Sequence, residues 1–259
     1  MVKGLYTAYT GMINQQNRMD VLTNNLANAA TTGFKKEGST SVPFDEVLAI
    51  KIKDSSEAFV NKGIGMMNMG VKIGETYTDY GQGAFQVTDN TYDLALEGNG
   101  FFSIAFTNKA GETSIKYTRD GSFTVNKEGY LVTKDGDFVQ GQNGNVQLNP
   151  NVEASAIKFD SLGNLFVNNE FIDRLNIVDF EDYNYLQKYG ENLYEAVEGA
   201  TVTEGDFKLH QGCLEASNVN VVSEMVEMIN VTRAYETNQK MIQTMDSTIE
   251  KAVNNVGKL

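Results

Sequence analysis

The sequence predicts an α+β fold, with α-helices at the two termini that pair as a coiled coil and a central antiparallel β-rich domain. Apolar residues recur every seven positions near both ends of the chain, which is the spacing of a helix that packs along another helix. Between the ends, short β-rich runs alternate with glycine-containing turns. A chain of 259 residues is long enough for one large domain or two smaller ones with a real core.

The N-terminal helix is expected over residues 4–30. Its apolar file consists of Leu5, Met12, Met19 and Leu26, and the positions three further on are Ala8, Gln15, Leu22 and Ala29. Gln15 is a polar interruption in this seam. The stripe is too narrow to anchor a domain by itself, so it requires a partner.

The C-terminal segment repeats the pattern with a file of Val221, Met228, Tyr235, Ile242, Ile249 and Val256. The companion positions four further on are mixed, namely Met225, Thr232, Gln239, Asp246 and Val253. Ser217 or Asn218 is expected to cap a helix of about 38 residues, and Gly257 lies where a C-terminal glycine is expected. The two narrow stripes can bury each other, so we expect the terminal helices to pair.

The middle of the chain is predicted to be β structure. Five glycine turns, "TNKAGETS", "VNKEGYL", "TKDGDF", "GQNGNV" and "DSLGNL", recur between β-rich runs, and each glycine supplies the positive φ that a tight hairpin needs. We therefore divide the chain into an N-terminal helical segment (1–35), an extended Gly- and Met-rich excursion (36–84), an antiparallel β domain (85–205) and a C-terminal helical segment (206–259).

The charge distribution limits the possible partners. The net charge is −13, and residues 37–214 hold 13 basic and 27 acidic residues, so the middle supplies nearly all of it. Such a surface repels nucleic acid and anionic lipid. No apolar run is long enough to span a membrane, and the N-terminus lacks the apolar core of a secretory signal. Cys213 is the only cysteine, which rules out a disulfide within the chain.

Several patterns resemble active sites but have simpler interpretations. Gly98 and Gly100 fit a β-turn better than a phosphate cradle, and His210 and Cys213 lack a second pair of metal ligands. The acidic pairs Asp135/Asp137 and Glu181/Asp182 lie in or beside turns. "RDG" at 119–121 is expected to form a hairpin turn, with Arg119 in a surface ion pair. The sequence therefore predicts a structural protein without catalytic, metal or cofactor sites.

Four segments resemble the flagellar basal-body rod and hook protein family. "LYTAYTGMINQQNRMDVLTNNLANAATTGFKK" (5–36) is similar to the family's N-terminal signature, and "LEASNVNVVSEMVEMINVTRAYETNQKMIQTMD" (214–246) to its C-terminal signature. "YDLALEGNGFFSI" (92–104) and "YTRDGSFTVNKEGYLVT" (117–133) resemble segments that rod and hook proteins share. The layout is most similar to distal-rod members, and proximal-rod members are a close second.

The resemblance assigns particular residues to the family motifs. They are Asn24, Asn25, Ala27 and Asn28 on the N-terminal helix, Gly33 and Phe34 on the turn that leaves it, and Ser217, Asn218, Val219, Arg233, Tyr235 and Asn238 near the C-terminus. The family usually has a proline before the Gly-Phe pair, where this chain has Thr32. Without proline the turn is less rigid, and Gly33 keeps it feasible.

The resemblance also implies a function. Family members are exported unfolded by the flagellar type III apparatus, without a cleaved signal, and polymerise helically into the hollow axial shaft between motor and hook. The terminal helices form an inner tube with the β domain outside it. We expect the seam residues Leu5, Met12, Met19, Leu22, Leu26, Val221, Met228, Tyr235, Ile242, Ile249 and Val256 to form its contacts, including those between subunits. The expected partners are further copies of the chain, neighbouring rod and hook proteins, the export apparatus and surrounding ring proteins.

Two other function classes are compatible with the residues. One is a monomeric, extracellular β-rich binding module, for example for a glycan, whose terminal helices hold it closed. The other is a peptidoglycan hydrolase fused to a rod element, which requires a catalytic Glu in a cleft that no motif supports. Filaments that form with rising concentration would distinguish the structural protein from both.

Overall fold

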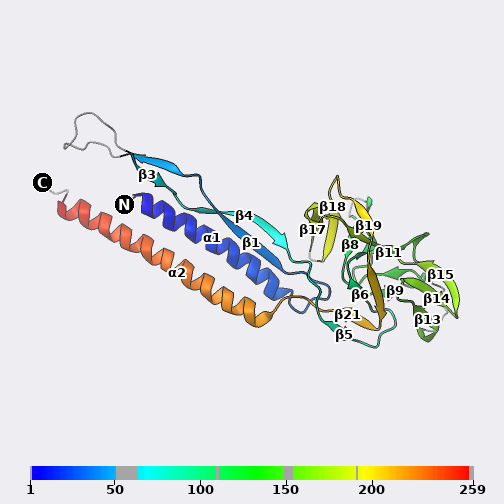
Figure 1. The fold of residues 1–259 in the computed structure, drawn as a ribbon. Helices are drawn as coiled ribbons and strands as arrows, with labels where there is room; N and C mark the ends of the chain where they lie inside the picture. Colours follow the sequence, from blue (N-terminus) through cyan, green and yellow to red (C-terminus); the bar gives the residue numbers. More distant parts are fainter. Residues whose placement is uncertain (1, 51–62, 109–110, 149–153, 191, 257–259) are drawn as a thin grey trace. The chain divides into compact units, whose positions relative to one another are not determined.

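The computed structural model describes residues 2–50, 63–108, 111–148, 154–190 and 192–256. The chain divides into two compact units (Figure 1). Unit 1 consists of Met1–Ala27, Glu37–Asp79 and Asn220–Leu259, and unit 2 consists of Asn28–Lys36 and Tyr80–Val219. Each unit is therefore built from segments that lie far apart in the sequence.

Unit 1 contains two long helices, α1 (Val2–Ala27) and α2 (Val221–Lys251). The side chain of Asn220 caps α2 by accepting a hydrogen bond from the N–H of Ser223 at 3.1 Å. The expected caps, Ser217 and Asn218, are therefore wrong, and α2 is 31 residues long. A π-helical turn, η3 (Ala252–Val256), follows it, and Gly257 lies outside the described residues. Within the described part of the chain, neither helix is long and apolar enough to cross a membrane.

The two helices lie side by side and run antiparallel (Figure 1). Glycines bring them close together. A Cβ atom on Gly4 would lie 2.7 Å from Cε of Met245, and one on Gly11 would lie 3.0 Å from Nδ2 of Asn238. These two glycines are seven residues apart on α1, and their partners are seven apart on α2. The two glycines therefore occupy equivalent positions, one heptad apart, on the face of α1 that contacts α2.

The face of α2 that meets α1 differs from the expected one in its second line of residues. The four residues of the expected file from Met228 to Ile249 are half-buried. The second line lies three positions further on rather than four, and it consists of Glu224, Val231, Asn238 and Met245. Met225, Gln239, Asp246 and Val253 are exposed instead. Residues three and four positions after a residue of the file are both its neighbours on the helix surface. The file alone therefore does not determine which of the two lines faces α1.

Unit 1 also contains two antiparallel two-stranded sheets. β1 (Glu37–Pro43) pairs antiparallel with β4 (Val71–Thr78), and β2 (Val47–Ile50) pairs antiparallel with β3 (Gly63–Met67). The β1–β4 sheet packs along α1 (Figure 1). The buried side chain of Asn14 on α1 donates a hydrogen bond to Oγ of Ser41 at 3.0 Å. α1 therefore has α2 along one face and the two-stranded β1–β4 sheet along another.

Unit 2 is the β-rich domain, and all of its strand pairs within the described residues are antiparallel. Its largest sheet has ten strands, β17 (Leu186–Tyr189), β18 (Leu193–Ala196), β8 (Thr113–Thr118), β7 (Phe101–Thr107), β11 (Phe138–Gly141), β10 (Leu131–Val132), β9 (Thr124–Val125), β12 (Gly144–Asn145), β16 (Ile177–Phe180) and β19 (Val202–Glu204). Three smaller sheets consist of β13 (Ile157–Phe159), β14 (Asn164–Val167) and β15 (Glu170–Arg174); of β6 (Leu94–Gly98) and β20 (Phe207–Gln211); and of β5 (Phe85–Val87) and β21 (Cys213–Glu215).

The predicted glycine turns are confirmed. The glycines of the five quoted turns, at positions 111, 129, 136, 144 and 163, all have positive φ. In four of them the glycine N–H donates to the carbonyl three residues earlier, as Gly136 does to Thr133 at 3.1 Å. The residue that accepts this bond also donates its own N–H across the turn, as Thr133 does to Asp137 at 2.9 Å. This is a type I turn closed by a glycine at positive φ.

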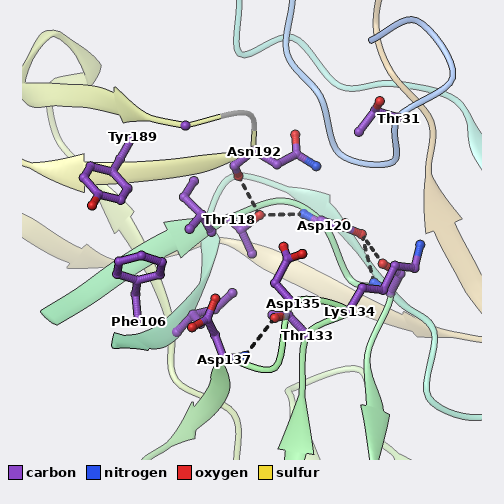
Figure 2. Close-up of a pocket in the computed structure, with 14 residues that line it drawn as sticks. Thr31, Phe106, Thr118, Asp120, Thr133, Lys134, Asp135, Asp137, Tyr189 and Asn192 are labelled. Carbon is purple, nitrogen blue, oxygen red and sulfur yellow. Dashed lines mark hydrogen bonds between the residues drawn. The ribbon is translucent and has the colours of Figure 1, made fainter. Parts of the chain in front are cut away.

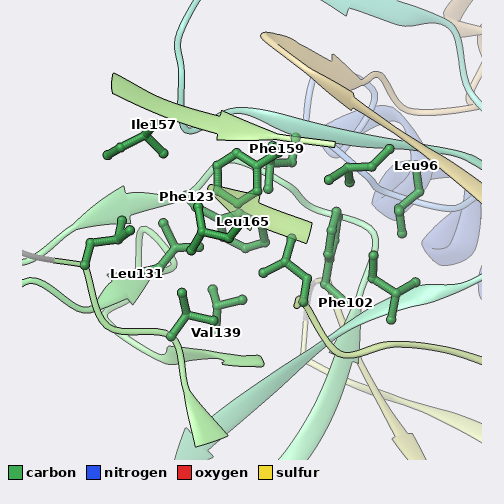
Figure 3. Packing of buried hydrophobic residues seen from close by; sticks show 14 of the residues in the cluster. Leu96, Phe102, Phe123, Leu131, Val139, Ile157, Phe159 and Leu165 are labelled. Carbon is green, nitrogen blue, oxygen red and sulfur yellow. The ribbon is translucent and has the colours of Figure 1, made fainter. Parts of the chain in front are cut away.

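The main core of unit 2 lies between the strands of these sheets (Figure 3). It includes Leu96, Phe102, Phe123, Leu131, Val139, Ile157, Phe159 and Leu165. The rings of Phe102 and Phe123 pack edge to face at a centroid distance of 5.2 Å. A second cluster consists of Phe101, Phe180, Leu186 and Tyr194. Phe101 and Phe102 are neighbours on β7, so their side chains point to opposite faces of the strand and serve different clusters.

Candidate functional site

Most of the seam residues are at least half-buried on α1 and α2. Leu22 is buried on α1, and Leu5, Met12, Met19 and Leu26 are half-buried there. On α2, Met228, Tyr235, Ile242 and Ile249 are half-buried, whereas Val221 is 43% exposed. Val256 lies in the π-helical turn after α2. Nine of the eleven seam residues are thus buried or half-buried on the two helices, and Met19 lies 3.9 Å from the hydroxyl of Thr232 across the helix pair.

A buried polar contact closes one end of this helix pair. Asn25 on α1 is fully buried, and its side chain donates to Oε2 of Glu224 at 3.1 Å and to the carbonyl of Glu37 at 2.8 Å. Its Oδ1 accepts the N–H of Glu37 at 2.9 Å. Asn25 therefore ties α1 to the first turn of α2 and to the first residue of β1.

Two apolar patches lie on the outer sides of the helices. The α1 patch consists of Tyr6, Tyr9 and Ile13, and the α2 patch consists of Val222, Met225, Val226 and Ile229. All seven side chains are exposed. Tyr9 and Ile13 lie two residues before and after Gly11. Two residues correspond to a rotation of about 200° around the helix, so both side chains lie on the side of α1 opposite Gly11. Val222 and Val226 flank the buried Glu224 in the same way, so both patches face away from the helix pair.

The turn after α1, residues 28–36, folds with unit 2. Gly33 has φ 68°, and a Cβ atom there would lie 2.5 Å from the carbonyl carbon of Arg119. Phe34 is 1% exposed, and Nζ of Lys188 lies 4.3 Å from the centre of its ring. The hydroxyl of Thr32 donates to Oδ1 of Asp120 at 2.8 Å. Gly33 is thus required both by its backbone conformation and by the closeness of a neighbouring segment.

Asp120 and Gly121 do not form the expected hairpin turn. Oδ1 of Asp120 accepts hydrogen bonds from Thr32 and from the N–H and hydroxyl of Ser122. A Cβ atom on Gly121 would lie 1.6 Å from the carbonyl oxygen of Leu94. Gly121 therefore allows the backbone to pass close to Leu94, and Asp120 anchors the turn after α1.

The remaining motif residues are divided between the two units. Asn218 accepts the N–H of Lys36 at 2.7 Å and donates to the carbonyl of Gly81 at 3.1 Å, which joins three segments of unit 2. Val219 is buried, and Oγ of Ser217 accepts its N–H at 3.2 Å. Asn28 accepts the N–H and the hydroxyl of Thr31. In unit 1, Asn24, Ala27 and Arg233 are exposed on their helices, and Asn238 faces Gly11.

A buried cluster of three charged side chains lies beneath this turn. Nζ of Lys35 is 2.6 Å from Oε1 of Glu215, and Arg119 is 3.5 Å from Oε2. The three side chains are between 1% and 4% exposed. The expectation that Arg119 forms a surface pair is therefore wrong. Lys35 and Glu215 were not predicted as site residues, although both lie within the resembling segments.

A cavity of about 370 Å³ lies beside the same turn in unit 2 (Figure 2). Phe106 and Tyr189, whose rings pack edge to face at 5.3 Å, line one part of it, and Asp135 and Asp137 line another. Burial raises the pKa of the Asp137 carboxyl above its usual value, and the charge of Asp135 adds to this rise. Neither histidine nor cysteine is among its lining residues, and the described residues contain no cluster of potential metal ligands.

Comparisons with known proteins cover both ends and the centre of the chain. Residues 5–35 match the family "Flagella basal body rod protein", residues 95–167 match "Flagellar hook protein FlgE/F/G D1 domain", and residues 210–255 match "Flagellar basal body rod FlgEFG protein C-terminal". The chain is 33% identical to the flagellar basal-body rod protein FlgG of Bacillus subtilis, over 98% of this chain and 99% of that protein. It is 34% identical to FlgG of Borreliella burgdorferi, over 98% of each chain. It is 31% identical to the basal-body rod protein FlgF of Caulobacter vibrioides, over the full length of both.

Proposed function

The chain belongs to the flagellar basal-body rod protein family and is a structural subunit of the rod, and from this premise we propose that its terminal helices pair as a coiled coil and polymerise helically with further copies. Family membership implies assembly with other rod and hook proteins. The polymer is a hollow axial shaft that transmits torque from motor to hook and conducts exported subunits. It performs this work without catalysis or a cofactor.

The finer assignments belong to the same proposal. In this proposal the helices α1 and α2 of unit 1 supply the inner tube, and unit 2 supplies the outer β domain. The expected boundaries at residues 35 and 206 therefore move to 27 and 220, and Glu37–Asp79 of the expected excursion belongs to unit 1. The seam residues and the motif residues of unit 1 form the contacts that hold the tube. The chain leaves the cell through the flagellar export apparatus without a cleaved signal and lies outside the cytoplasmic membrane, where the surrounding ring proteins are further partners.

The observation that carries self-assembly is the pair of exposed patches on the two helices. Exposed apolar side chains that gather on one face of a helix mark a contact surface. The α1 patch lies beside the Gly11–Asn238 contact, and the α2 patch lies beside the Asn25–Glu224 contact. At 1.5 Å per residue their centres are roughly 20 Å apart along the helix axis. The patches are thus at opposite ends and on opposite sides of the helix pair.

Two different patches in this arrangement favour a head-to-tail contact over a two-fold dimer. In a head-to-tail contact the α1 patch of one copy meets the α2 patch of the next, and the contact repeats without closing. The distribution of net charge between the two units also favours a contact through unit 1. Unit 2 holds 11 basic and 21 acidic residues, for a net charge of −10, whereas unit 1 holds 10 and 13, for −3. Copies therefore repel each other less through unit 1 than through unit 2.

Mixing two variants tests the proposal. Tyr9→Asp removes the α1 patch, and Met225→Asp removes the α2 patch. We expect each variant to fail to form filaments at concentrations where the unchanged protein does, as seen by electron microscopy. Mixed together they should form pairs but no filaments, because each copy retains one intact patch. Thr23→Asp, at an exposed position of α1 about 15 Å along the helix from Ile13, is the matched control and should polymerise normally.

Filaments of both single variants would contradict a contact through these patches. A monomeric β-rich binding module, the alternative function, predicts instead that the unchanged protein remains a monomer at every concentration. The two results are distinguished by sedimentation of the unchanged protein alone.

A further inference from the structure

The loop between β6 and β7 contains one of the two Asn-Gly pairs in the chain. The pairs are Asn99-Gly100 and Asn143-Gly144. An asparagine that precedes glycine can bring its side chain to the next backbone nitrogen with little hindrance, because glycine has no Cβ atom. The side chain of Asn99 is exposed, and it forms no hydrogen bond or ion pair within the described part of the chain.

The peptide group that joins Asn99 to Gly100 is not held by hydrogen bonds. Among the described residues, neither the carbonyl of Asn99 nor the N–H of Gly100 has a hydrogen-bond partner. Gly100 is buried, and buried N–H groups without a partner are rare in folded proteins. The preceding peptide group is held at both ends, because the N–H of Asn99 donates to the carbonyl of Asp206 at 3.2 Å and Arg119 donates to the carbonyl of Gly98 at 2.8 Å. Rotation of the peptide group after Asn99 therefore breaks no hydrogen bond.

The second Asn-Gly pair is held at both of the corresponding groups. Nδ2 of Asn143 donates to Oδ1 of Asp173 at 3.0 Å, which fixes the side-chain amide. Gly144 lies in β12, opposite Gly141 in the antiparallel pairing with β11, so its backbone belongs to a strand pair. The two pairs have the same two residues and differ in how the fold holds them.

From this contrast we propose that Asn99 is a site of spontaneous deamidation and that the fold protects Asn143 from the same reaction. The backbone nitrogen of Gly100 gives its proton to hydroxide and attacks Cγ of Asn99. The new bond closes a succinimide ring. The bond between Cγ and the side-chain nitrogen breaks, and that nitrogen takes a proton from water and leaves as ammonia, which regenerates the hydroxide. No group is oxidised or reduced.

Water then opens the ring at either of its carbonyl groups. One product is aspartate in a normal main chain, and the other is isoaspartate, in which the main chain runs through the former side chain and is longer by one methylene group. Both products add a negative charge to a chain whose net charge is already −13. Isoaspartate also displaces the main chain beside Gly98, whose carbonyl accepts the hydrogen bond from the buried Arg119. Unit 2 should therefore lose stability as Asn99 is converted.

Peptide mass spectrometry of the full-length protein, incubated at mildly alkaline pH, tests the proposal. We expect the peptide with Asn99 to be converted severalfold faster than the peptide with Asn143, and to contain isoaspartate, which isoaspartyl methyltransferase labels. In urea, where the fold is lost, the two rates should become similar. Conversion of Asn143 as fast as Asn99 in the folded protein would overturn the proposal. The same ratio of rates in urea would also overturn it, because the fold would then not be the cause.

Two variants complete the test. Asn99→Gln is the matched control, because glutamine has to close a larger ring, and it should abolish conversion at position 99 and leave Asn143 unchanged. Asp173→Ala removes the acceptor of the Asn143 amide and should speed conversion of Asn143 without affecting Asn99. An unchanged rate at Asn143 in this variant would contradict protection by that hydrogen bond. If Asp173→Ala does not fold, the comparison of the unchanged protein with and without urea decides the question.

Discussion

Gly11 of α1 lies against Asn238 of α2, so close that a Cβ atom on the glycine would be 3.0 Å from the Nδ2 atom of the asparagine. The same relationship holds one heptad away between Gly4 and Met245. A glycine within a helix costs about 1 kcal/mol relative to alanine. This chain has two of them on one face of α1, which is explained by the close approach of the helices that they allow.

Replacing Gly11 with leucine should therefore separate the helices. The new side chain would have to displace Asn238, and the narrow contact face offers no space for it. We expect a lower helix content by circular dichroism in dilute solution, although leucine has the higher helix propensity. Asn17→Leu, at an exposed position on the same helix, is the control and should raise the helix content or leave it unchanged. Equal effects of the two substitutions would show that Gly11 does not control the contact.

Ile242→Asp should disrupt the helix pair and leave unit 2 folded. Ile242 is half-buried in the contact face, so the lost burial is worth about 1–2 kcal/mol, and an uncompensated charge adds to that cost. Thermal unfolding followed separately at helical and near-ultraviolet wavelengths checks both parts. Gln243→Asp, at the exposed position next to Ile242, is the control and should change neither the helical nor the near-ultraviolet transition. An unchanged helix signal in Ile242→Asp would mean that this residue lies at no important contact.

Gly33→Ala should be more costly than the same change at Gly136. Both glycines have positive φ, which disfavours alanine by about 1–2 kcal/mol. A Cβ atom on Gly136 meets nothing within 4 Å, whereas one on Gly33 would lie 2.5 Å from the backbone of Arg119 and Asp120. Urea unfolding of unit 2 should show a loss of stability well above 2 kcal/mol for Gly33→Ala, since a backbone clash is added to the φ cost. Similar losses at both positions would refute the close approach.

Thr32→Pro should have little net effect on stability. A compatible proline stabilises by about 0.4–1 kcal/mol through the unfolded state, but the change also removes the hydroxyl that donates to Asp120 at 2.8 Å, and such a bond is worth about 0.5–1.5 kcal/mol. Thr32→Val removes only the hydroxyl and should therefore be less stable than Thr32→Pro. The reverse order in urea unfolding would show that the backbone at position 32 does not accept proline.

Tyr183 should make unit 2 less stable at high pH. Burial raises the pKa of Tyr183 to about 12, and its hydrogen bond to Asp179 adds to this rise, compared with an ordinary value of 10. The unfolded chain therefore loses this proton at lower pH than the folded chain does. Stability is retained below pH 10 and is lost as the pH rises from 10 towards 12. Tyr183→Phe should reduce the change in the free energy of unfolding between pH 10 and 12. An unchanged slope in this variant would show that other groups cause the pH dependence.

Local features were the most predictable from the sequence. The hairpin glycines were predicted correctly because a tight turn determines its own conformation from a few neighbouring residues. The heptad files were informative for the same reason, since helical spacing is a local property. The cap of α2 was placed two or three residues too early because Ser217, Asn218 and Asn220 are all good capping residues. Asn218 is instead used by Lys36 and Gly81, far away in the chain.

Contacts between distant segments could not be predicted in this way. Arg119 looked like half of a surface pair because nothing near it in the sequence indicates burial. Its partner Glu215 lies 96 residues away, and only the folded domain brings the two together. The choice between companion residues three or four positions from the α2 file also depends on where α1 lies. Side-chain pairing across the fold is therefore a property of the packed structure rather than of any short stretch of sequence.

The interleaving of the two units has an evolutionary consequence. Unit 2 is made from a short stretch after α1 and one long stretch, Tyr80–Val219, that starts and ends next to parts of unit 1. An insertion or deletion in a hairpin of Tyr80–Val219 does not change which residues of α1 contact which residues of α2. Unit 2 can thus diverge in size and surface among relatives while the helical pair stays under strict selection. Two rates of sequence change are expected within a single gene.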